Sequence, residues 1–281
     1  VERGDILDTA FLADVFARHE IGGVIHFAAL KAVGESVQRP LDYFTTNCGG
    51  LAGLLRAMDD HDVRHLVFSS SATVYGASGA EALGEDTPRS HTSPYAFTKL
   101  TSEDLLIAMG AADARWRFGI LRYFNPAGAH ESGLIGEAPA DIPNNLVPLV
   151  ARVATGVSPR LQVFGNDYDT ADGTGVRDYV HVMDLAEAHV ASLKALIAQG
   201  ASHTVNIGTG VGSSVLEVIG AYARACGREL PWELAPRRDG DVARLVADPA
   251  LAARVLGFRT RRDLDAICES SWRWMRRNCA D

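Results

Sequence analysis

Residues 93–99, Ser-Pro-Tyr-Ala-Phe-Thr-Lys, decide the fold together with the apolar run 65–69 and the serines that follow it. Pro94 suits the first turn of a helix. Tyr95 and Lys99 are four residues apart, so a helix places both side chains on one face. An ammonium beside a phenol favours the phenolate, which lets a tyrosine act as a base near neutral pH. The pattern therefore predicts a catalytic tyrosine–lysine pair.

A hydroxyl at the end of a neighbouring strand would complete this site. Residues 65–69 predict a buried strand, and Ser69, Ser70 and Ser71 stand at its carboxyl end, where open α/β sheets bind ligands. One of these hydroxyls could share the substrate's proton. A Tyr-x-x-x-Lys spacing also arises by chance on surface helices, but its place after a serine-rich strand end favours the catalytic interpretation.

Strands and helices alternate along the first half of the chain. Residues 24–29, 65–69 and 118–123 predict buried strands, while 41–60 and the segment after Pro94 predict helices. This alternation is typical of an α/β fold with a Rossmann-like, doubly wound parallel sheet.

The pattern changes at Asn125, where long loops rich in Asn, Gly and Pro begin. Long loops in a compact protein are usually binding elements. We expect residues 1–124 to form a partial Rossmann domain. Residues 125–281 are expected to form mainly a smaller α/β substrate domain, with some segments returning to the first. Arg177 and Arg238 stand on loops of this second part, and arginine forks suit diphosphate oxygens.

The Gly-rich turn that opens a dinucleotide-binding sheet is not found near the start of the chain. We therefore expect the chain to begin inside a Rossmann domain, after a first βαβ unit and second strand of about fifty residues. Residues 208–212, Gly-Thr-Gly-Val-Gly, are the one Gly-rich candidate, but they come late and lack the right continuation. We interpret them as a tight strand–helix turn rather than a pyrophosphate site.

Composition excludes several classes of protein. The net charge of −8, without any Lys/Arg run, argues against nucleic-acid binding, and no apolar stretch is long enough to span a bilayer. The nine histidines contain no His-Glu-x-x-His motif, so we expect no metal site. The cysteines lack a Cys-x-x-Cys pair, which fits reduced thiols in a cytoplasmic protein; they are Cys48, Cys226, Cys268 and Cys279.

Six runs spread over the chain carry a family resemblance: residues 26–36, 69–76, 121–126, 142–146, 164–168 and 172–182. Together they resemble the UDP-glucose 4-epimerase family of the extended short-chain dehydrogenase/reductase superfamily. The last run, Asp-Gly-Thr-Gly-Val-Arg-Asp-Tyr-Val-His-Val, is long and specific. The resemblance covers essentially the whole chain present.

The resemblance implies roles for individual residues. It makes Tyr95 the base, Lys99 its partner and a ligand of the nicotinamide ribose, and Ser71 the active-site hydroxyl. The residues that it assigns to NAD are Asp5, Ile6, Phe27, Ala28, Ala29, Lys31, Ser69, Tyr95, Lys99 and Tyr123. Those that it assigns to the UDP-hexose are Ser71, Phe124, Asn125, Asn145, Leu146, Gln162, Val163, Phe164, Arg177, Arg238 and Asp241.

The implied reaction inverts C4 of a UDP-hexose through a 4-keto sugar, with NAD as cofactor. Leu245 stands where some family members have a tyrosine against the sugar, so an N-acetylated hexose is a further expected substrate. Thr46 stands where the family often has a cofactor-contacting asparagine, with Asn47 adjacent. The resemblance also implies a homodimer that pairs through the helices at 41–60 and 94–109.

Two alternatives stay open at this point. One is another nucleotide-sugar enzyme of the superfamily, a dehydratase or decarboxylase. Dehydratases typically carry an Asp-Glu pair just after the serine-rich strand end, where this chain has residues 72–75, Ala-Thr-Val-Tyr. The other is a non-catalytic nucleotide-sugar-binding or NAD-binding protein, which the presence of Tyr95, Lys99 and Ser71 disfavours.

Overall fold

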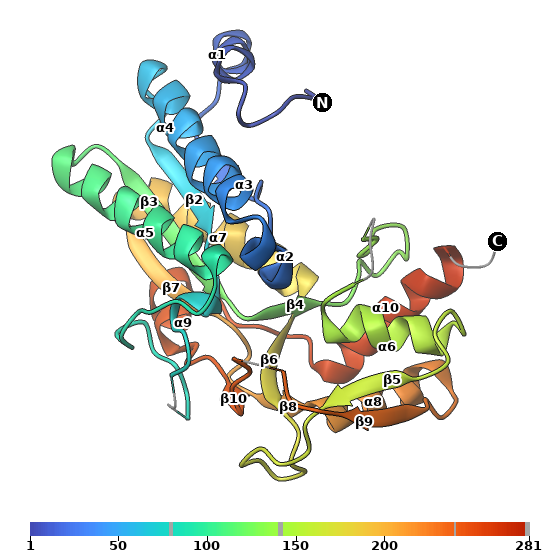
Figure 1. Ribbon diagram of the computed structural model, residues 1–281. Coiled ribbons are helices and arrows are strands. Elements are labelled where there is room, and N and C mark those ends of the chain that lie inside the picture. The colour runs from blue at the N-terminus through green and yellow to red at the C-terminus, as the bar shows by residue number, and fades with distance from the viewer. Residues whose placement is uncertain (79–80, 140–142, 239, 279–281) are drawn as a thin grey trace. The chain divides into compact units, whose positions relative to one another are not determined.

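The computed structural model describes residues 1–78, 81–139, 143–238 and 240–278, which form two compact units (Figure 1). Cys279 and Ile142, named above, lie outside the described residues. Unit 1 comprises Val1–Gly76, Glu85–Arg122 and His189–Val205. Unit 2 comprises Ala77–Gly84, Tyr123–Ala188 and Asn206–Asp281.

A parallel sheet forms the centre of unit 1. Its strands run in the order β1-β2-β3-β7, and β2 pairs in parallel with both β1 and β3. This confirms the predicted α/β fold with a parallel sheet. Parallel strands end at one edge of their sheet, so the carboxyl ends of β1 to β3 are neighbours. The bounds are β1 (Val24–His26), β2 (His65–Ser69), β3 (Arg117–Tyr123) and β7 (His203–Ile207).

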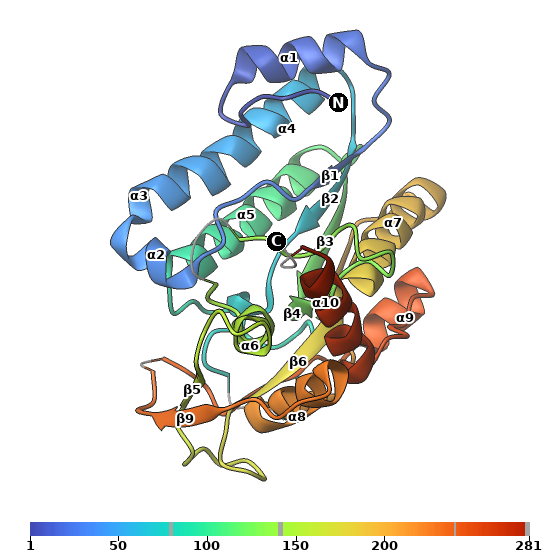
Figure 2. The same ribbon diagram turned by 90° about the vertical axis from the view of Figure 1, so that its right-hand side faces the viewer.

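The prediction of one helix over residues 41–60 is wrong in one respect, because the observed helix is interrupted. A π-helical segment, η1 (Phe44–Gly49), separates α3 (Pro40–Tyr43) from α4 (Gly50–Asp60). Such segments often occur at functional sites. The α3 and η1 segments pack against α5 (Pro94–Ala112), the helix of the predicted catalytic pair (Figure 2). The remaining helices before α5 are α1 (Thr9–Arg18), α2 (Val33–Gln38) and the short η2 (Ala72–Val74).

Apolar side chains from helices and strands fill the interior of unit 1. Leu51 and Met58 of α4, Leu66 of β2 and Leu106 of α5 are all fully buried in one cluster. Burial of each such side chain contributes roughly 1.5–3 kcal/mol. This packing holds β2 and α5 together and so fixes the two elements that carry the predicted catalytic residues.

Unit 2 is built around β6 (Val176–His181). β6 pairs in parallel with β4 (Asn125–Ala127) and β10 (Arg244–Leu245), and antiparallel with β8 (Gly212–Ser214). A separate parallel pair joins β5 (Leu161–Phe164) to β9 (Trp232–Ala235). Its helices pack around a second core, and Figure 2 shows α10 against α8. The later helices of the chain are α6 (Leu146–Ala154), α7 (Val182–Gln199), α8 (Val215–Cys226), α9 (Ala250–Leu256) and α10 (Leu264–Asn278).

The Gly-rich segment 208–212 is a tight connection from β7 to β8 and α8, as predicted. It wraps around the fully buried carboxylate of Asp178, which accepts hydrogen bonds from the backbone N–H groups of Thr209 (2.9 Å) and Gly210 (2.9 Å). A Cβ on Gly208 would lie 2.6 Å from that carboxylate, and Gly210 has φ +76°. The amides that a pyrophosphate would need are therefore already bound to an acidic side chain.

Candidate active site

Tyr95 and Lys99 lie on one face of α5, as their spacing predicts. Ser93 caps the helix, because its hydroxyl accepts a hydrogen bond from the N–H of Ala96 (3.2 Å), and Pro94 occupies the first turn. Both side chains are buried, and the Lys99 Nζ lies 5.9 Å from the centre of the Tyr95 ring. The sequence of this helix start therefore places a phenol and an ammonium together.

Lys99 is a buried cation with few protein partners. Burial lowers its pKa to about 8, while the nearby Cys48 and Glu103 act in the opposite direction, so the ammonium form prevails at neutral pH. Its Nζ donates to the backbone oxygen of Ser69 (2.8 Å) and lies 4.9 Å from the centre of the Phe68 ring. That carbonyl is its one hydrogen-bond acceptor among the described residues. An ammonium has three N–H donors, so Lys99 can also bind hydroxyls of a ligand.

The three serines after β2 have different partners. Ser69 hydrogen-bonds His189 Nε2 (2.8 Å), and Ser70 donates to the Glu103 carboxylate (2.5 Å). Ser71 instead accepts from the backbone N–H of Thr73 (3.2 Å) and from its hydroxyl (3.0 Å). Because Ser71 acts as an acceptor in both bonds, its own O–H proton can still be donated. Of the three hydroxyls, Ser71 is the one suited to a substrate.

The loop after β1 carries four of the ten residues predicted to bind NAD. Phe27 is 57% exposed, with its ring 4.5 Å from that of His189, and Ala28 and Lys31 are exposed beside it. The buried Asn47 of η1 holds this loop, since its amide bonds both the N–H (2.8 Å) and the carbonyl (3.0 Å) of Leu30. An asparagine therefore does shape this loop, but it is Asn47 and not the residue at position 46, which is Thr46.

The other predicted NAD residues lie apart from this loop in the sequence. Asp5 uses its carboxylate to accept from the N–H of Leu7 (2.9 Å), and Ile6 packs against the core of unit 1. A Cβ on Gly50 would lie 2.8 Å from Ile6, so the glycine permits this packing. Tyr123 belongs to unit 2.

Unit 2 contains a cavity of about 230 Å³ where most of the predicted substrate residues meet. It lies among β5, β6, the start of α6 and the turn before β10. The predicted residues that line it are Asn125, Asn145, Leu146, Gln162, Phe164, Arg177, Arg238 and Asp241.

The charged end of this cavity is held by one carboxylate between two guanidinium groups. Asp241 lies 3.6 Å from Arg177 and 2.8 Å from Arg238. Arg177 is also fixed by hydrogen bonds to the carbonyls of Val176 and Val242, both 2.9 Å. The trio carries a net charge of +1, and guanidinium forks bind phosphate oxygens in pairs, so this end suits a diphosphate.

Strand geometry separates the predicted residues that line the cavity from those that do not. Leu161 and Val163 of β5 are buried, whereas Gln162 and Phe164 face the cavity, because successive side chains alternate across a strand. Phe124 is also buried and does not line the cavity.

The sequence analysis missed several residues that line the cavity, although Tyr168 and Tyr179 stand in the motifs that it quotes. The missed residues are Asn144, Leu149, Tyr168, Gly175, Tyr179 and Val215.

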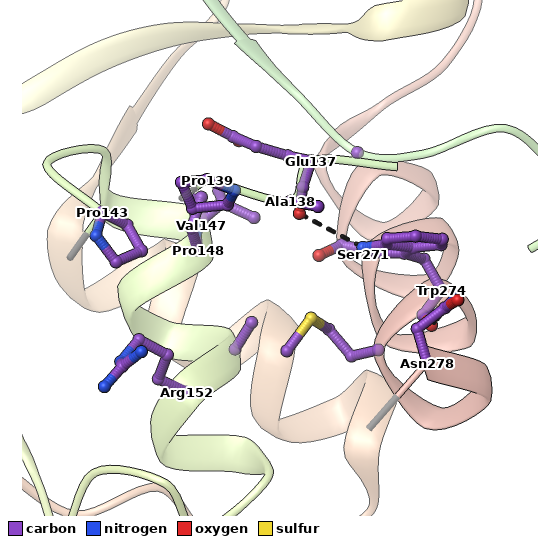
Figure 3. A pocket seen from close by; sticks show the side chains of 13 residues that line it. Glu137, Ala138, Pro139, Pro143, Val147, Pro148, Arg152, Ser271, Trp274 and Asn278 are labelled. Atoms are coloured by element: carbon purple, nitrogen blue, oxygen red, sulfur yellow. Dashed lines mark hydrogen bonds between the residues drawn. The ribbon is translucent and has the colours of Figure 1, made fainter. Parts of the chain in front are cut away.

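A second cavity of unit 2, about 210 Å³, lies between α6, α10 and residues 137–139 (Figure 3). Its lining is mostly apolar, and the Trp274 indole N–H donates to the Glu137 carbonyl across one side (3.2 Å). None of the sequence-predicted site residues lines it. Arg152 is the one cation in its lining, so it lacks the paired guanidinium groups of the first cavity, which is therefore the candidate nucleotide site.

Comparisons with known proteins identify the family to which the chain belongs. A family profile described as "GDP-mannose 4,6 dehydratase" matches residues 1–271. UDP-glucose 4-epimerase of Bacillus subtilis is 51% identical over 274 residues, which cover 98% of this chain and 81% of that protein. The Bos taurus enzyme of the same name is 50% identical over 278 residues, or 99% of this chain and 80% of its own length. This chain belongs to the UDP-glucose 4-epimerase family.

Solved structures of the UDP-glucose 4-epimerase family share this fold. The enzyme from Stenotrophomonas maltophila, solved with NAD and formylated UDP-arabinopyranose, has a TM-score of 0.97 and 48% identity, covering 99% of this chain and 83% of that one. The Bifidobacterium longum enzyme, solved with NAD⁺ and UDP, has a TM-score of 0.93 and 47% identity over the same shares.

The strand end after β2 disfavours the dehydratase alternative. There η2 presents Ala72, Thr73 and Val74, and none of them is a carboxylic acid.

Within the described ranges, no three His, Cys, Asp or Glu side chains gather to hold a metal ion. No helix in those ranges is long and apolar enough to cross a membrane.

Proposed function

We propose that this chain is an NAD-dependent isomerase that inverts C4 of UDP-hexoses, interconverting UDP-glucose and UDP-galactose. The observation that carries the proposal is the buried Tyr95–Lys99 pair of α5, in a chain about 50% identical to UDP-glucose 4-epimerases over nearly its whole length. The nucleotide cavity of unit 2 supplies the second requirement, a firm hold on UDP.

Tyr95 takes the proton of the sugar's 4-hydroxyl and later returns it. The Lys99 ammonium stabilises the phenolate, because an opposite charge nearby favours the ionised form. Ser71 donates its O–H to the same sugar oxygen and so shares the proton. General acid–base catalysis of this kind contributes about 10²–10⁴-fold to a rate.

The residues of unit 1 fit NAD. Lys99 is a buried ammonium with N–H donors left for ribose hydroxyls, and the exposed ring of Phe27 with Ala28 and Ala29 offers an apolar surface at the carboxyl end of β1. Asp5, Ile6, Lys31 and Ser69, together with Tyr123 of unit 2, complete the proposed set. The chemistry that NAD supplies when bound is reversible acceptance of hydride from C4.

The cavity of unit 2 anchors the nucleotide while the sugar turns over. Arg177 and Arg238 bind the diphosphate, and Asn125, Asn145, Gln162 and Phe164 contact the nucleoside and sugar. Inversion requires the 4-keto sugar to present its other face, so the UDP contacts must be strong and the sugar contacts weak.

The direct test is turnover of UDP-galactose by the purified chain with added NAD, followed by analysis of the product. UDP-glucose is the expected product, and a 4-keto-6-deoxy sugar would instead establish a dehydratase. Binding of UDP without any turnover would leave only the non-catalytic alternative.

We propose that N-acetylated UDP-hexoses are also substrates. Leu245 pairs in register with Arg177 of the nucleotide cavity, so its side chain lies on the same face of the sheet. A leucine leaves more room beside the sugar than a tyrosine. UDP-N-acetylglucosamine should therefore be converted to its C4 epimer, and an enzyme that turns over UDP-glucose alone would exclude this extension.

We also propose a cytoplasmic homodimer. On unit 1, exposed apolar side chains follow α3 and α5, with Leu41 at 76%, Phe97 at 39% and Ile107 at 53%. Sedimentation equilibrium should give the mass of two chains, and Ile107→Asp should reduce it to one; a single-chain mass for the unmodified protein would exclude the dimer. Cys48, Cys226 and Cys268 are free thiols, which suits a reducing compartment.

A further inference from the structure

Tyr168, one of the residues that line the nucleotide cavity, carries an unsatisfied buried hydroxyl. Its side chain is 6% exposed and lines the cavity, and its buried hydroxyl has no hydrogen-bond partner among the described residues. Buried hydroxyls are nearly always hydrogen-bonded, because an unmet one carries its full desolvation cost. A ligand that hydrogen-bonded this hydroxyl would remove that cost.

The phenol is also held in place before any ligand arrives. The Arg237 guanidinium lies 3.9 Å from the centre of the Tyr168 ring, and Arg237 Nε is bound to the Asp167 carboxylate (2.6 Å). Gly165 makes this stack possible, since it has φ +79° and a Cβ there would lie 2.8 Å from the ring. The stack therefore fixes the position of the Tyr168 ring.

We infer that the Tyr168 hydroxyl hydrogen-bonds the nucleoside half of the UDP-sugar and so sets nucleotide affinity. The inference rests on the proposed function and adds a binding residue to it. Tyr168 follows β5, whose Gln162 and Phe164 line the same cavity. A neutral phenol suits the carbonyl and hydroxyl groups of a nucleoside, whereas Arg177 and Arg238 already supply the charge that phosphates require.

Tyr168→Phe tests the inference, because it removes one oxygen and keeps the ring on Arg237. Affinity for UDP and for uridine, measured by calorimetry and by competition, should fall by the same factor of about five to thirty, equivalent to about 1–2 kcal/mol. The KM for UDP-galactose should rise by a similar factor, and kcat should stay unchanged. The melting temperature of the ligand-free protein should not fall, since no protein hydrogen bond is lost.

Tyr222→Phe is the matched control. Its hydroxyl is paired with Ser271 (3.2 Å) in the core of unit 2, so its removal should lower the melting temperature and leave UDP affinity unchanged. Unchanged UDP affinity in Tyr168→Phe, or a fall in its ligand-free melting temperature, would overturn the inference. Weaker binding of inorganic pyrophosphate with unchanged binding of uridine would also overturn it. Failure of the unmodified protein to bind UDP would instead refute the proposed function.

Discussion

Tyr95→Phe should lower kcat by about 10²- to 10⁴-fold while leaving UDP affinity unchanged. The substitution removes the group that exchanges the proton of the 4-hydroxyl. The described residues that line the nucleotide cavity all belong to unit 2, so UDP affinity should be unchanged. Turnover of UDP-galactose and calorimetric titration with UDP measure the two quantities separately.

Tyr43→Phe serves as the control for this substitution. Tyr43 is another buried tyrosine of unit 1, and its hydroxyl donates to the Ala32 carbonyl and to Glu35, both at 2.8 Å. Its loss should reduce stability with little change in kcat. Turnover near that of the unmodified protein in Tyr95→Phe would remove Tyr95 from its proposed role.

The dependence of the same reaction on pH reports on Lys99. With Lys99→Met the phenol loses the nearby cation that favours its ionised form. Activity should then be low at neutral pH and should recover as the pH is raised. An unchanged pH profile of kcat would show that Lys99 does not act on the phenol.

The fold and the catalytic helix could be predicted because local patterns determine them. The apolar run of β2 predicts a buried strand, and the Ser-Pro start of α5 predicts a helix that places Tyr95 and Lys99 on one face, as observed. Both predictions use only neighbouring residues. The alternation of buried and facing residues in β5 likewise follows from strand geometry, and it explains why Val163 lies in the core beside Gln162.

The parts that could not be predicted depend on contacts distant in sequence. The π-helical segment η1 turns Asn47 towards Leu30, seventeen positions earlier, and no periodic pattern indicates this. The segment 208–212 wraps around Asp178, thirty-one positions before Thr209. Nor can a sequence show that the hydroxyl of Tyr168 lacks a partner among the described residues, because that depends on everything packed around it.

Glu103→Ala should lower the free energy of unfolding by about 3–5 kcal/mol, the usual cost of leaving one partner of a buried ion pair alone. Glu103 is fully buried and accepts two-pronged hydrogen bonds from Arg122, at 2.7 Å from Nη2 and 3.0 Å from Nε. Burial tends to lower the pKa of Arg122, but the hydrogen bonds and charges of Glu103 and Tyr75 together leave that pKa raised. Without Glu103 the guanidinium would keep its charge in a poorly solvated site.

Urea denaturation at neutral pH would measure the effect, and two further variants would isolate its cause. Asp14→Ala breaks the exposed pair with Arg18 and should change the stability little, because solvent screens that pair. Adding Arg122→Met to Glu103→Leu should recover most of the lost stability, since apolar groups can replace a buried ion pair. If Glu103→Ala cost as little as Asp14→Ala, the Glu103–Arg122 pair would not be what holds α5 against the end of β3.

Ser70 also donates to Glu103, so the same carboxylate joins α5 to the strand end that carries Ser71. A loss of stability here should therefore be accompanied by a loss of turnover.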